Sequence, residues 1–478
     1  MTWRGKRVHF IGIGGIGMSG IAKMLHSQGA AVTGSDINSR EKVEELRGLG
    51  IQVELGPHDA ANIHPDIDIV VISAAIKPSN VELREARRYG IRILTYAEML
   101  GWLMSEMKGV AISGTHGKTT TTAMTASILT AAGLGPSFVI GGEVRALGGS
   151  SRVGTGDIFV AEACEYRRSF HSLHPHVAVI TNIEEDHLDY YHDIHEITES
   201  FREFASQVPG DGLIVANTQD RNVRTAVAKQ QARVETYGVR VEADWMGSEP
   251  VWDGERTRFH ASFQGAPIGE FELKVVGVHN VLDALAAMAA SSCLGAPMEA
   301  VYEGLAKFEG VGRRFEILGE CGGVTVADDY AHHPTEIQVT LKAARDRFPG
   351  RRIWCVFQPH QHSRTRFLMK DFARSFGNAD KIVIPDIYFV RDSEAERELV
   401  TSLDLVGEIS NLGGDAVYFP SFGEIEQYLM KNMRAGDLLI TMGAGDVYKV
   451  ARAVLDRMNG HADGKPDGAA LREKEANP

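Results

Sequence analysis

The residues with the clearest chemical meaning form the run Gly114-Thr115-His116-Gly117-Lys118-Thr119. Two glycines let the backbone curl so that its N–H groups face an anion, and a helix that starts after Lys118 would add its positive end. Lys118 can reach the outer phosphates of a nucleotide, and the Thr119 hydroxyl can ligate Mg²⁺. An apolar strand at residues 109–113 and a helix at residues 119–132 are predicted on either side. We therefore predict an ATP-binding loop rather than a tight turn that carries a GKT by chance.

A second glycine motif lies near the amino terminus. Gly12, Gly14 and Gly17 follow a predicted strand at residues 8–13 and open a helix at residues 16–28, and Asp36 ends the next strand. This pattern is known from NAD sites, but its physics requires only a helix N-terminus that holds a diphosphate, and an acid near a ribose or sugar. NAD and a UDP-sugar both satisfy it. A close helix–strand contact without a ligand is the remaining alternative.

Acidic and histidine residues follow two further predicted strands, at residues 157–160 and 177–180. Glu162 and His187 belong to these two runs. Because ligand sites in open parallel sheets lie beyond the carboxyl ends of strands, we expect both side chains to face the phosphates of the loop. Mg²⁺ prefers oxygen ligands, so His187 would be an unusual ligand, and a hydrogen-bonding role is its alternative.

The carboxyl-terminal third carries two polar, histidine-rich runs, residues 328–335 and 358–365. Each comes just after a predicted strand, at residues 324–327 and 353–357. Such loops are poor core material, so they are candidates for a binding site, although some of these histidines would serve equally as helix caps.

Strands alternate with helices along the chain, which predicts an α/β fold with parallel sheets flanked by helices. The 478 residues suggest three domains, at 1–107, 108–310 and 311–460, followed by a tail at 461–478 whose composition predicts disorder. Residues 242–272 alternate like β-strands and are interpreted as an insertion in the central domain.

Composition narrows the possible partners. The net charge of −13 disfavours a nucleic-acid binder, and the four cysteines form no CxxC, which fits a reduced compartment. No apolar run approaches the ~18–20 residues of a membrane helix. Basic residues before residue 8 mimic a signal peptide, but the glycines of the first motif interrupt the apolar run. We expect a cytoplasmic enzyme with small-molecule substrates and no membrane insertion. The sequence leaves its oligomeric state open between monomer and dimer.

Together these motifs resemble the Mur ligases, the ATP-dependent amide-forming enzymes of peptidoglycan precursor synthesis. The resemblance covers nearly the whole chain up to the tail, and further matches are His279-Asn280, Gly312-Arg313-Arg314-Phe315 and Gln358-Pro359-His360. It implies a Rossmann-like UDP-sugar-binding domain, a P-loop ATPase central domain and a Rossmann-like carboxyl-terminal domain that closes over the site. It also implies a reaction that joins L-alanine to the lactyl carboxylate of UDP-N-acetylmuramate through an acyl phosphate, with a ligase that recycles murein peptides as the alternative.

The resemblance implies a role for each matching residue, with ATP as co-substrate and Mg²⁺ or Mn²⁺ as cofactor. The implied ATP-binding residues are Gly114, Thr115, His116, Gly117, Lys118, Thr119, Thr120, His279, Asn280, Arg314 and Asp329. The implied UDP-sugar-binding residues are Gly12, Gly14, Gly15, Asp36, Ser73, Ala75, Ile76 and Asn182. The implied amino-acid site contains Tyr330, His333, His360 and Arg364, and the implied metal ligands are Thr119, Glu162 and His187. The implied catalytic residues are Lys118, His187, Arg314, His332 and His360.

The chain departs from the family pattern at three places. Asp283 stands where the family often has the last Asn of HNxxN, and His362 stands where it usually has Tyr, so the roles of both are open. Several sister ligases use a carbamylated lysine, but residues 188–210 contain no lysine, so we predict no carbamate. An NAD-dependent protein and a catalytically silent UDP-sugar sensor remain as rivals from other classes.

Overall fold

The computed structural model describes residues 3–38, 40–390 and 392–460, and the predicted tail lies outside them. The described residues form two compact units, residues 3–314 with 338–349, and residues 315–337 with 350–460. Each unit is an α/β structure, which confirms the predicted fold class. Within the described residues, no helix is both long enough and apolar enough to span a bilayer.

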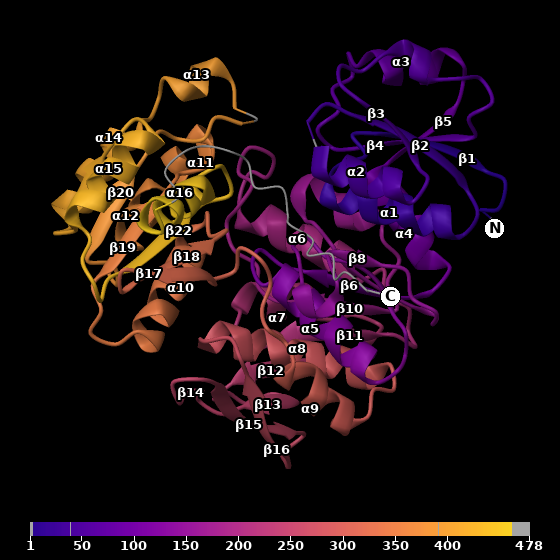
Figure 1. Ribbon diagram of the computed structural model, residues 1–478. Helices are drawn as coiled ribbons and strands as arrows, with labels where there is room; N and C mark the ends of the chain where they lie inside the picture. Colours follow the sequence, from indigo (N-terminus) through magenta and orange to yellow (C-terminus); the bar gives the residue numbers. More distant parts are fainter. Residues whose placement is uncertain (1–2, 39, 391, 461–478) are drawn as a thin grey trace, which may run out of the picture. The chain divides into compact units, whose positions relative to one another are not determined.

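The amino-terminal sheet of the first unit has five parallel strands in the order β3-β2-β1-β4-β5 (Figure 1, indigo). Because the order reverses between β1 and β4, the carboxyl ends of these two strands form the switch point where ligands bind in such sheets. Its strands are β1 (Arg7–Ile11), β2 (Ala31–Asp36), β3 (Gln52–Leu55), β4 (Ile69–Ile72) and β5 (Arg92–Thr95). Its helices are α1 (Ile16–Ser27), α2 (Arg40–Gly48), α3 (Val81–Arg88), α4 (Tyr96–Ser105) and the short η1 (Ala60–Asn62).

The central sheet has eleven strands, ten of them in the order β14-β15-β13-β12-β11-β10-β6-β9-β7-β8, with β16 paired to β15. Its strands are β6 (Lys108–Ser113), β7 (Ser137–Val139), β8 (Ser151–Arg152), β9 (Ile158–Glu162), β10 (Val177–Ile180), β11 (Leu213–Asn217), β12 (Arg233–Val239), β13 (Trp245–Gly247), β14 (Val251–Trp252), β15 (Thr257–Phe263) and β16 (Ala266–Leu273). Strand β6 lies between β9 and β10 and is parallel to both. The three polar loops that follow these strands therefore begin at the same edge of the sheet. The predicted β segment at residues 242–272 is present as β13 to β16.

The helices of the central region are α5 (Lys118–Ala131), α6 (Ile194–Ala205), α7 (Arg221–Val227), α8 (Val278–Cys293) and α9 (Met298–Ala306), with the short η2 (Arg145–Leu147) and η3 (Tyr166–Ser172). Helix α5 packs against α8 and α9. Glycines let the amino-terminal helices approach the central region: a Cβ at Gly20 of α1 would lie 3.0 Å from Cβ of Ser151, and one at Gly101 of α4 would overlap the carbonyl of Ser172. These contacts lie within one compact unit, which contains both sheets.

The second unit contains a six-stranded sheet in the order β17-β18-β22-β19-β20-β21, in which only β17 is antiparallel to its neighbour. Its strands are β17 (Glu316–Cys321), β18 (Val324–Asp329), β19 (Ile353–Phe357), β20 (Lys381–Ile384), β21 (Ala416–Tyr418) and β22 (Leu438–Met442). Helices α11 (His362–Phe367), α12 (Met369–Arg374), α13 (Glu394–Arg397), α14 (Ser402–Asn411), α15 (Phe422–Asn432) and α16 (Tyr448–Met458) follow, and α10 (Pro334–Arg347) spans the boundary between the units. The two histidine-rich runs follow β18 and β19, which are both neighbours of β22.

Candidate functional site

The phosphate loop connects β6 to α5 and depends on both of its glycines. Gly114 has φ +139° and Gly117 has φ +80°, both in the left-handed region that favours glycine. A Cβ at Gly114 would overlap the Thr181 hydroxyl, and one at Gly117 would lie 2.6 Å from Oδ1 of Asp283. Backbone conformation and close packing therefore both require glycine here.

Lys118 folds back over this loop. Its Nζ donates to the carbonyl of Gly114 and to that of Thr115 at 3.1 Å, and it lies 3.1 Å from a carboxylate oxygen of Glu165. Burial opposes the charge of the ammonium group, but the negative charge of Glu165 outweighs it and raises the pKa of Lys118. Lys118 is therefore a cation held at the start of α5, where a phosphate would meet both its charge and the helix end.

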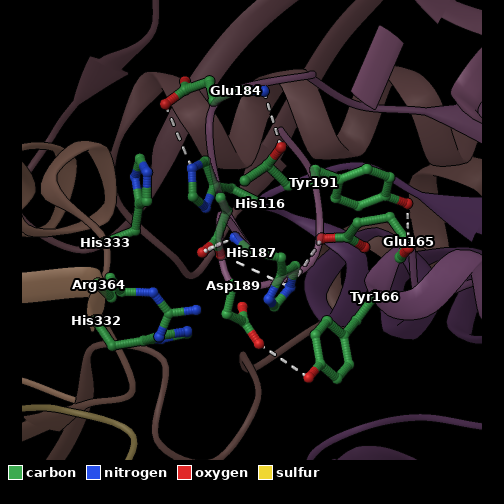
Figure 2. Close-up of polar contacts among 12 residues, drawn as sticks. His116, Glu165, Tyr166, Glu184, His187, Asp189, Tyr191, His332, His333 and Arg364 are labelled. Atoms are coloured by element: carbon green, nitrogen blue, oxygen red, sulfur yellow. Dashed lines mark hydrogen bonds and ion pairs between the residues drawn. The ribbon is translucent and has the colours of Figure 1, made fainter. Parts of the chain in front are cut away.

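Glu165 connects Lys118 to His187, a function that the sequence did not reveal. Its Oε1 lies 3.6 Å from Nε2 of His187, and its backbone carbonyl accepts from the Tyr191 hydroxyl at 2.6 Å (Figure 2). Burial would raise the pKa of Glu165, but the charge of Lys118 lowers it. The carboxylate thus stays ionised while being 3% exposed. The only available signal was its place three residues after Glu162 in the same loop.

The predicted metal ligands come from neighbouring strands and from the first turn of α5. Glu162 ends β9, and its Oε1 accepts from the backbone N–H of Gly141 at 2.5 Å. His187 adopts φ +55°, and the Tyr166 ring packs against its ring at a tilt, with 4.7 Å between centroids. Tyr166 in turn donates to Asp189 (Figure 2). Thr119 is 8% exposed. The Thr119 hydroxyl and the Glu162 carboxylate are oxygen donors of the kind that Mg²⁺ prefers, whereas the imidazole of His187 would be an unusual ligand.

Thr181 and Asn182 brace the phosphate loop from β10. The Asn182 side chain accepts from the backbone N–H of His116 at 2.8 Å and donates to its carbonyl at 3.2 Å. The Thr181 hydroxyl donates to the same carbonyl at 2.5 Å, and the His116 ring lies 3.5 Å from Glu184 (Figure 2). Asn182 therefore holds the loop in this structure, and its predicted contact with the UDP-sugar stays a prediction.

The first glycine motif lies at the switch point of the amino-terminal sheet. Gly12 has φ +82°, and a Cβ there would lie 3.0 Å from Cβ of Ser73, which follows β4. The carboxylate of Asp36 accepts from the backbone N–H groups of Gly14 at 2.9 Å and Asn38 at 3.0 Å. Asp36 thus first of all fixes the shape of the turn. The structure brings predicted UDP-sugar residues near β1 and β4 together, since Cδ1 of Ile76 would lie 3.7 Å from a Cβ at Gly12 and the backbone N–H of Ala75 donates to the Ser73 hydroxyl.

Helix α8 presents three polar residues beside the phosphate loop. Burial, followed by the charge of Arg314, lowers the pKa of His279 to about 4. Asn280 donates to the carbonyl of Val276 at 2.8 Å. Asp283 accepts from the Thr121 hydroxyl at 3.0 Å, and burial raises its pKa to about 7. Asp283 therefore packs against α5 and Gly117 as a carboxyl group that is readily protonated.

The predicted amino-acid residues cluster within the second unit. The rings of His332 and His360 lie 5.9 Å apart between centroids, and Tyr330 contacts His332 edge-on at 5.4 Å. Arg364 lies 3.3 Å from Nδ1 of His360, whose ring stacks on Tyr388, a residue that sequence reasoning missed.

Two more predicted residues of the second unit are buried next to this cluster. His333 is 4% exposed, and its Nδ1 accepts from the backbone N–H of Thr335 at 3.3 Å. Asp329, 4% exposed, accepts from the backbone N–H groups of Phe315 at 2.7 Å and Ala331 at 2.6 Å. The histidine-rich runs thus form one polar cluster and are not spread over separate surface loops.

A strained segment, η3, begins at Tyr166, immediately after Glu165. Two consecutive arginines, Arg167 and Arg168, have φ values of +52° and +55°. Arg168 donates to Glu196 at 2.9 Å, which ties the segment to α6. Left-handed backbone at non-glycine residues costs about 1–2 kcal/mol per residue and tends to occur at functional sites.

Comparison with known proteins agrees with this geometry over nearly the whole chain. Three family models match: the catalytic domain of the Mur ligase family at residues 7–108, the Mur ligase middle domain at residues 112–291, and the glutamate ligase domain of Mur ligases at residues 313–445. The UDP-N-acetylmuramate–L-alanine ligase of Caldanaerobacter subterraneus is 45% identical over 453 residues, which cover 94% of this chain and 97% of that protein.

Two solved structures are similar along nearly their whole length. The UDP-N-acetylmuramate–alanine ligase of Thermotoga maritima is 30% identical with a TM-score of 0.79, covering 95% of this chain and 99% of that one. A murein peptide ligase of Psychrobacter arcticus is 27% identical with a TM-score of 0.70 and the same coverage. From the ordered motifs, the geometry around Lys118 and these matches, it follows that this chain belongs to the Mur ligase family.

Proposed function

We propose that this chain is an ATP-dependent ligase that joins L-alanine to the lactyl carboxylate of UDP-N-acetylmuramate, releasing ADP and phosphate. The observation that carries the proposal is the 45% identity, over 94% of the chain, to a UDP-N-acetylmuramate–L-alanine ligase. The charged cluster of Lys118, Glu165 and His187 beside an intact phosphate loop supports it, because a silent sensor would not need such a cluster. Since ATP and nucleotide sugars are intracellular metabolites, the reaction belongs in the cytoplasm.

The first chemical step activates a carboxylate, which is a poor acylating agent because its leaving group would be oxide. A carboxylate oxygen attacks the γ-phosphorus of ATP, and the bond to the β-phosphate oxygen breaks, which gives an acyl phosphate and ADP. Catalysis of phosphoryl transfer consists mostly of positioning and charge neutralisation. Lys118 supplies positive charge at the loop, and Arg314 supplies it to the γ-phosphate.

In the second step the amine of L-alanine attacks the acyl carbon, and phosphate leaves as the amide bond forms. The amine must be neutral before it attacks. His332 or His360 accepts its proton, since both rings lie in the cluster that also contains Tyr330 and Arg364. Arg364 pairs with the carboxylate of the amino acid.

Thr119, Glu162 and His187 hold a divalent cation in this proposal. Glu162 ends β9 beside β6, which places a carboxylate at the edge where the phosphate loop begins. Mg²⁺ supplies charge neutralisation for the phosphate oxygens when it is bound, and Mn²⁺ would serve in the same way. Asp329, Asn280 and His279 bind the nucleoside part of ATP.

The test measures ADP release by the purified protein. ADP should form only when both UDP-N-acetylmuramate and L-alanine are present. The similarity to the murein peptide ligase of Psychrobacter arcticus raises a second possibility, that a peptide rather than L-alanine is joined to the lactyl carboxylate. Competition between L-alanine and a tripeptide separates the two, and preferential use of the tripeptide would overturn the alanine assignment.

A further inference from the structure

Tyr96 begins α4, and its hydroxyl lies against the first turn of α1. A Cβ added at Gly17 would come within 2.5 Å of that hydroxyl oxygen. The start of α4 is fixed by a capping box in which Thr95 and Glu98 exchange hydrogen bonds. The third glycine of the first motif is therefore required by the position of the Tyr96 ring.

The surroundings of this hydroxyl keep it protonated. Burial, followed by the negative charge of Glu162, raises the pKa of Tyr96 well above its ordinary value. The charge of Glu162, at the end of β9, thus contributes to this shift, and the hydroxyl itself lies against Gly17 of α1. Tyr96 is partly exposed, and its hydroxyl makes no hydrogen bond to the described residues 3–38, 40–390 and 392–460. The Tyr96 hydroxyl is therefore a neutral donor beside the first turn of α1.

We propose that Tyr96 is a substrate-binding residue whose hydroxyl donates a hydrogen bond to the diphosphate of the UDP-sugar. This inference rests on the proposed function, because it requires a substrate whose diphosphate lies at the N-terminus of α1 and whose carboxylate reaches Lys118. The Tyr96 hydroxyl lies beside the first turn of α1, where it would be close to the diphosphate of such a substrate. A phenol that keeps its proton binds an anionic oxygen without adding charge of its own.

The experiment compares Tyr96→Phe with the wild type. Phenylalanine keeps the ring against Gly17 and removes only the hydroxyl. Because a hydrogen bond to a charged group is lost, the KM for UDP-N-acetylmuramate should rise about 10- to 100-fold, while the KM values for ATP and L-alanine stay within about twofold. The ratio of the variant's KM for UDP-N-acetylmuramate to that of the wild type should be constant between about pH 6 and pH 9, since the Tyr96 hydroxyl stays protonated throughout. Tyr89→Phe is the matched control, because Tyr89 is an exposed tyrosine of the same sheet domain that ends α3.

Calorimetric titration with UDP and with UDP-N-acetylmuramate locates the contact. If Tyr96 binds the diphosphate, the variant should bind both ligands more weakly than the wild type. Loss of affinity for UDP-N-acetylmuramate alone would overturn the diphosphate contact, and equal affinity of wild type and variant for both would overturn the role of Tyr96. If the wild type itself fails to bind UDP-N-acetylmuramate, the proposed function fails first, so the two failures are distinguishable.

Discussion

Lys118 shows how one residue serves a site before any substrate is present. Its charge is matched by Glu165, and its Nζ is held by two carbonyls of its own loop. The side chain is therefore ordered in advance, and we propose that ATP binding exchanges these contacts for phosphate oxygens. Preorganised charge of this kind is usually the largest contribution to catalysis.

Lys118→Ala should lower the kcat for ADP formation by about a hundredfold or more, because the transferred phosphoryl group loses its nearest cation. Coupled ADP release under saturating substrates measures the effect. Lys342→Ala, which removes an exposed lysine that pairs with Asp346, is the control and should leave kcat unchanged. Undiminished turnover of the Lys118 variant would refute the role of the loop.

Asp283→Asn should change the pH dependence of stability. The folded protein holds the pKa of this carboxyl at about 7, against roughly 4 in an unfolded chain, so the folded state binds more protons in this window. The free energy of unfolding of the wild type should therefore fall as pH rises from about 4 to 7. Asparagine does not titrate, so the variant should not show this decrease. Urea unfolding at about pH 5 and pH 8 checks this: the variant should gain stability relative to the wild type at the higher pH. The shift of His279 has the opposite sign but is common to both proteins, so it cancels in the difference.

The sequence pointed to individual residues where a spacing rule applied, and their roles stay predictions. Lys118, Glu162 and His187 follow from their places after strands of one parallel sheet, and the structure brings them to one edge. Glu165 was not assigned a role, because its contact with Lys118 depends on how the backbone turns after β9. No local pattern encodes that turn.

At the scale of single elements, apolar runs beside glycine-rich or polar runs predicted several of the strands and helices that position the site. The helix predicted at residues 119–132 is α5, Lys118–Ala131, and the strand predicted at residues 177–180 is β10. Strand order could not be predicted, because pairing of β6 with both β9 and β10 is set by packing between distant segments. The braces that Thr181 and Asn182 supply to the loop depend on that order.

Gly117→Ala and Gly133→Ala compare the two ends of α5. Both glycines have positive φ, +80° and +71°, so alanine is strained at either position. Only Gly117 meets a neighbour, Asp283, whereas nothing lies within 4 Å of a Cβ at Gly133. The KM for ATP should rise about tenfold or more in Gly117→Ala and stay unchanged in Gly133→Ala, while thermal melting shows a loss of stability in both. Equal KM values in the two variants would mean that the loop tolerates displacement.

For the whole molecule, the three sheets followed from the alternation of strands and helices, but their grouping did not. The amino-terminal and central sheets lie in one compact unit, in which Gly20 admits the Ser151 side chain and Gly101 admits the Ser172 carbonyl. These contacts require that Gly20 and Gly101 have no side chain. Neither composition nor periodicity predicts such contacts. The domain boundaries at residues 107 and 310 stay predictions.

Removal of divalent cations should separate catalysis from folding. A chelator should abolish ADP formation, while melting of the nucleotide-free protein should shift by no more than about 2 °C. Mg²⁺ is typically held by one or two carboxylates together with substrate phosphates, so it contributes little to a chain without nucleotide. Circular dichroism and the ADP assay, each repeated after Mg²⁺ is restored, measure both effects. A large fall in melting temperature would instead indicate a structural metal.

The tandem left-handed arginines after Glu165 have a consequence for protein engineering. Glycine at residue 167 or 168 would adopt the same backbone angles without steric cost, so substitution there is a direct route to a more stable fold. The chain nevertheless carries arginine at both positions, and Arg168 connects the segment to α6 through its hydrogen bond to Glu196. A stabilised enzyme designed from this sequence should therefore leave residue 168 unchanged and accept glycine first at the exposed residue 167.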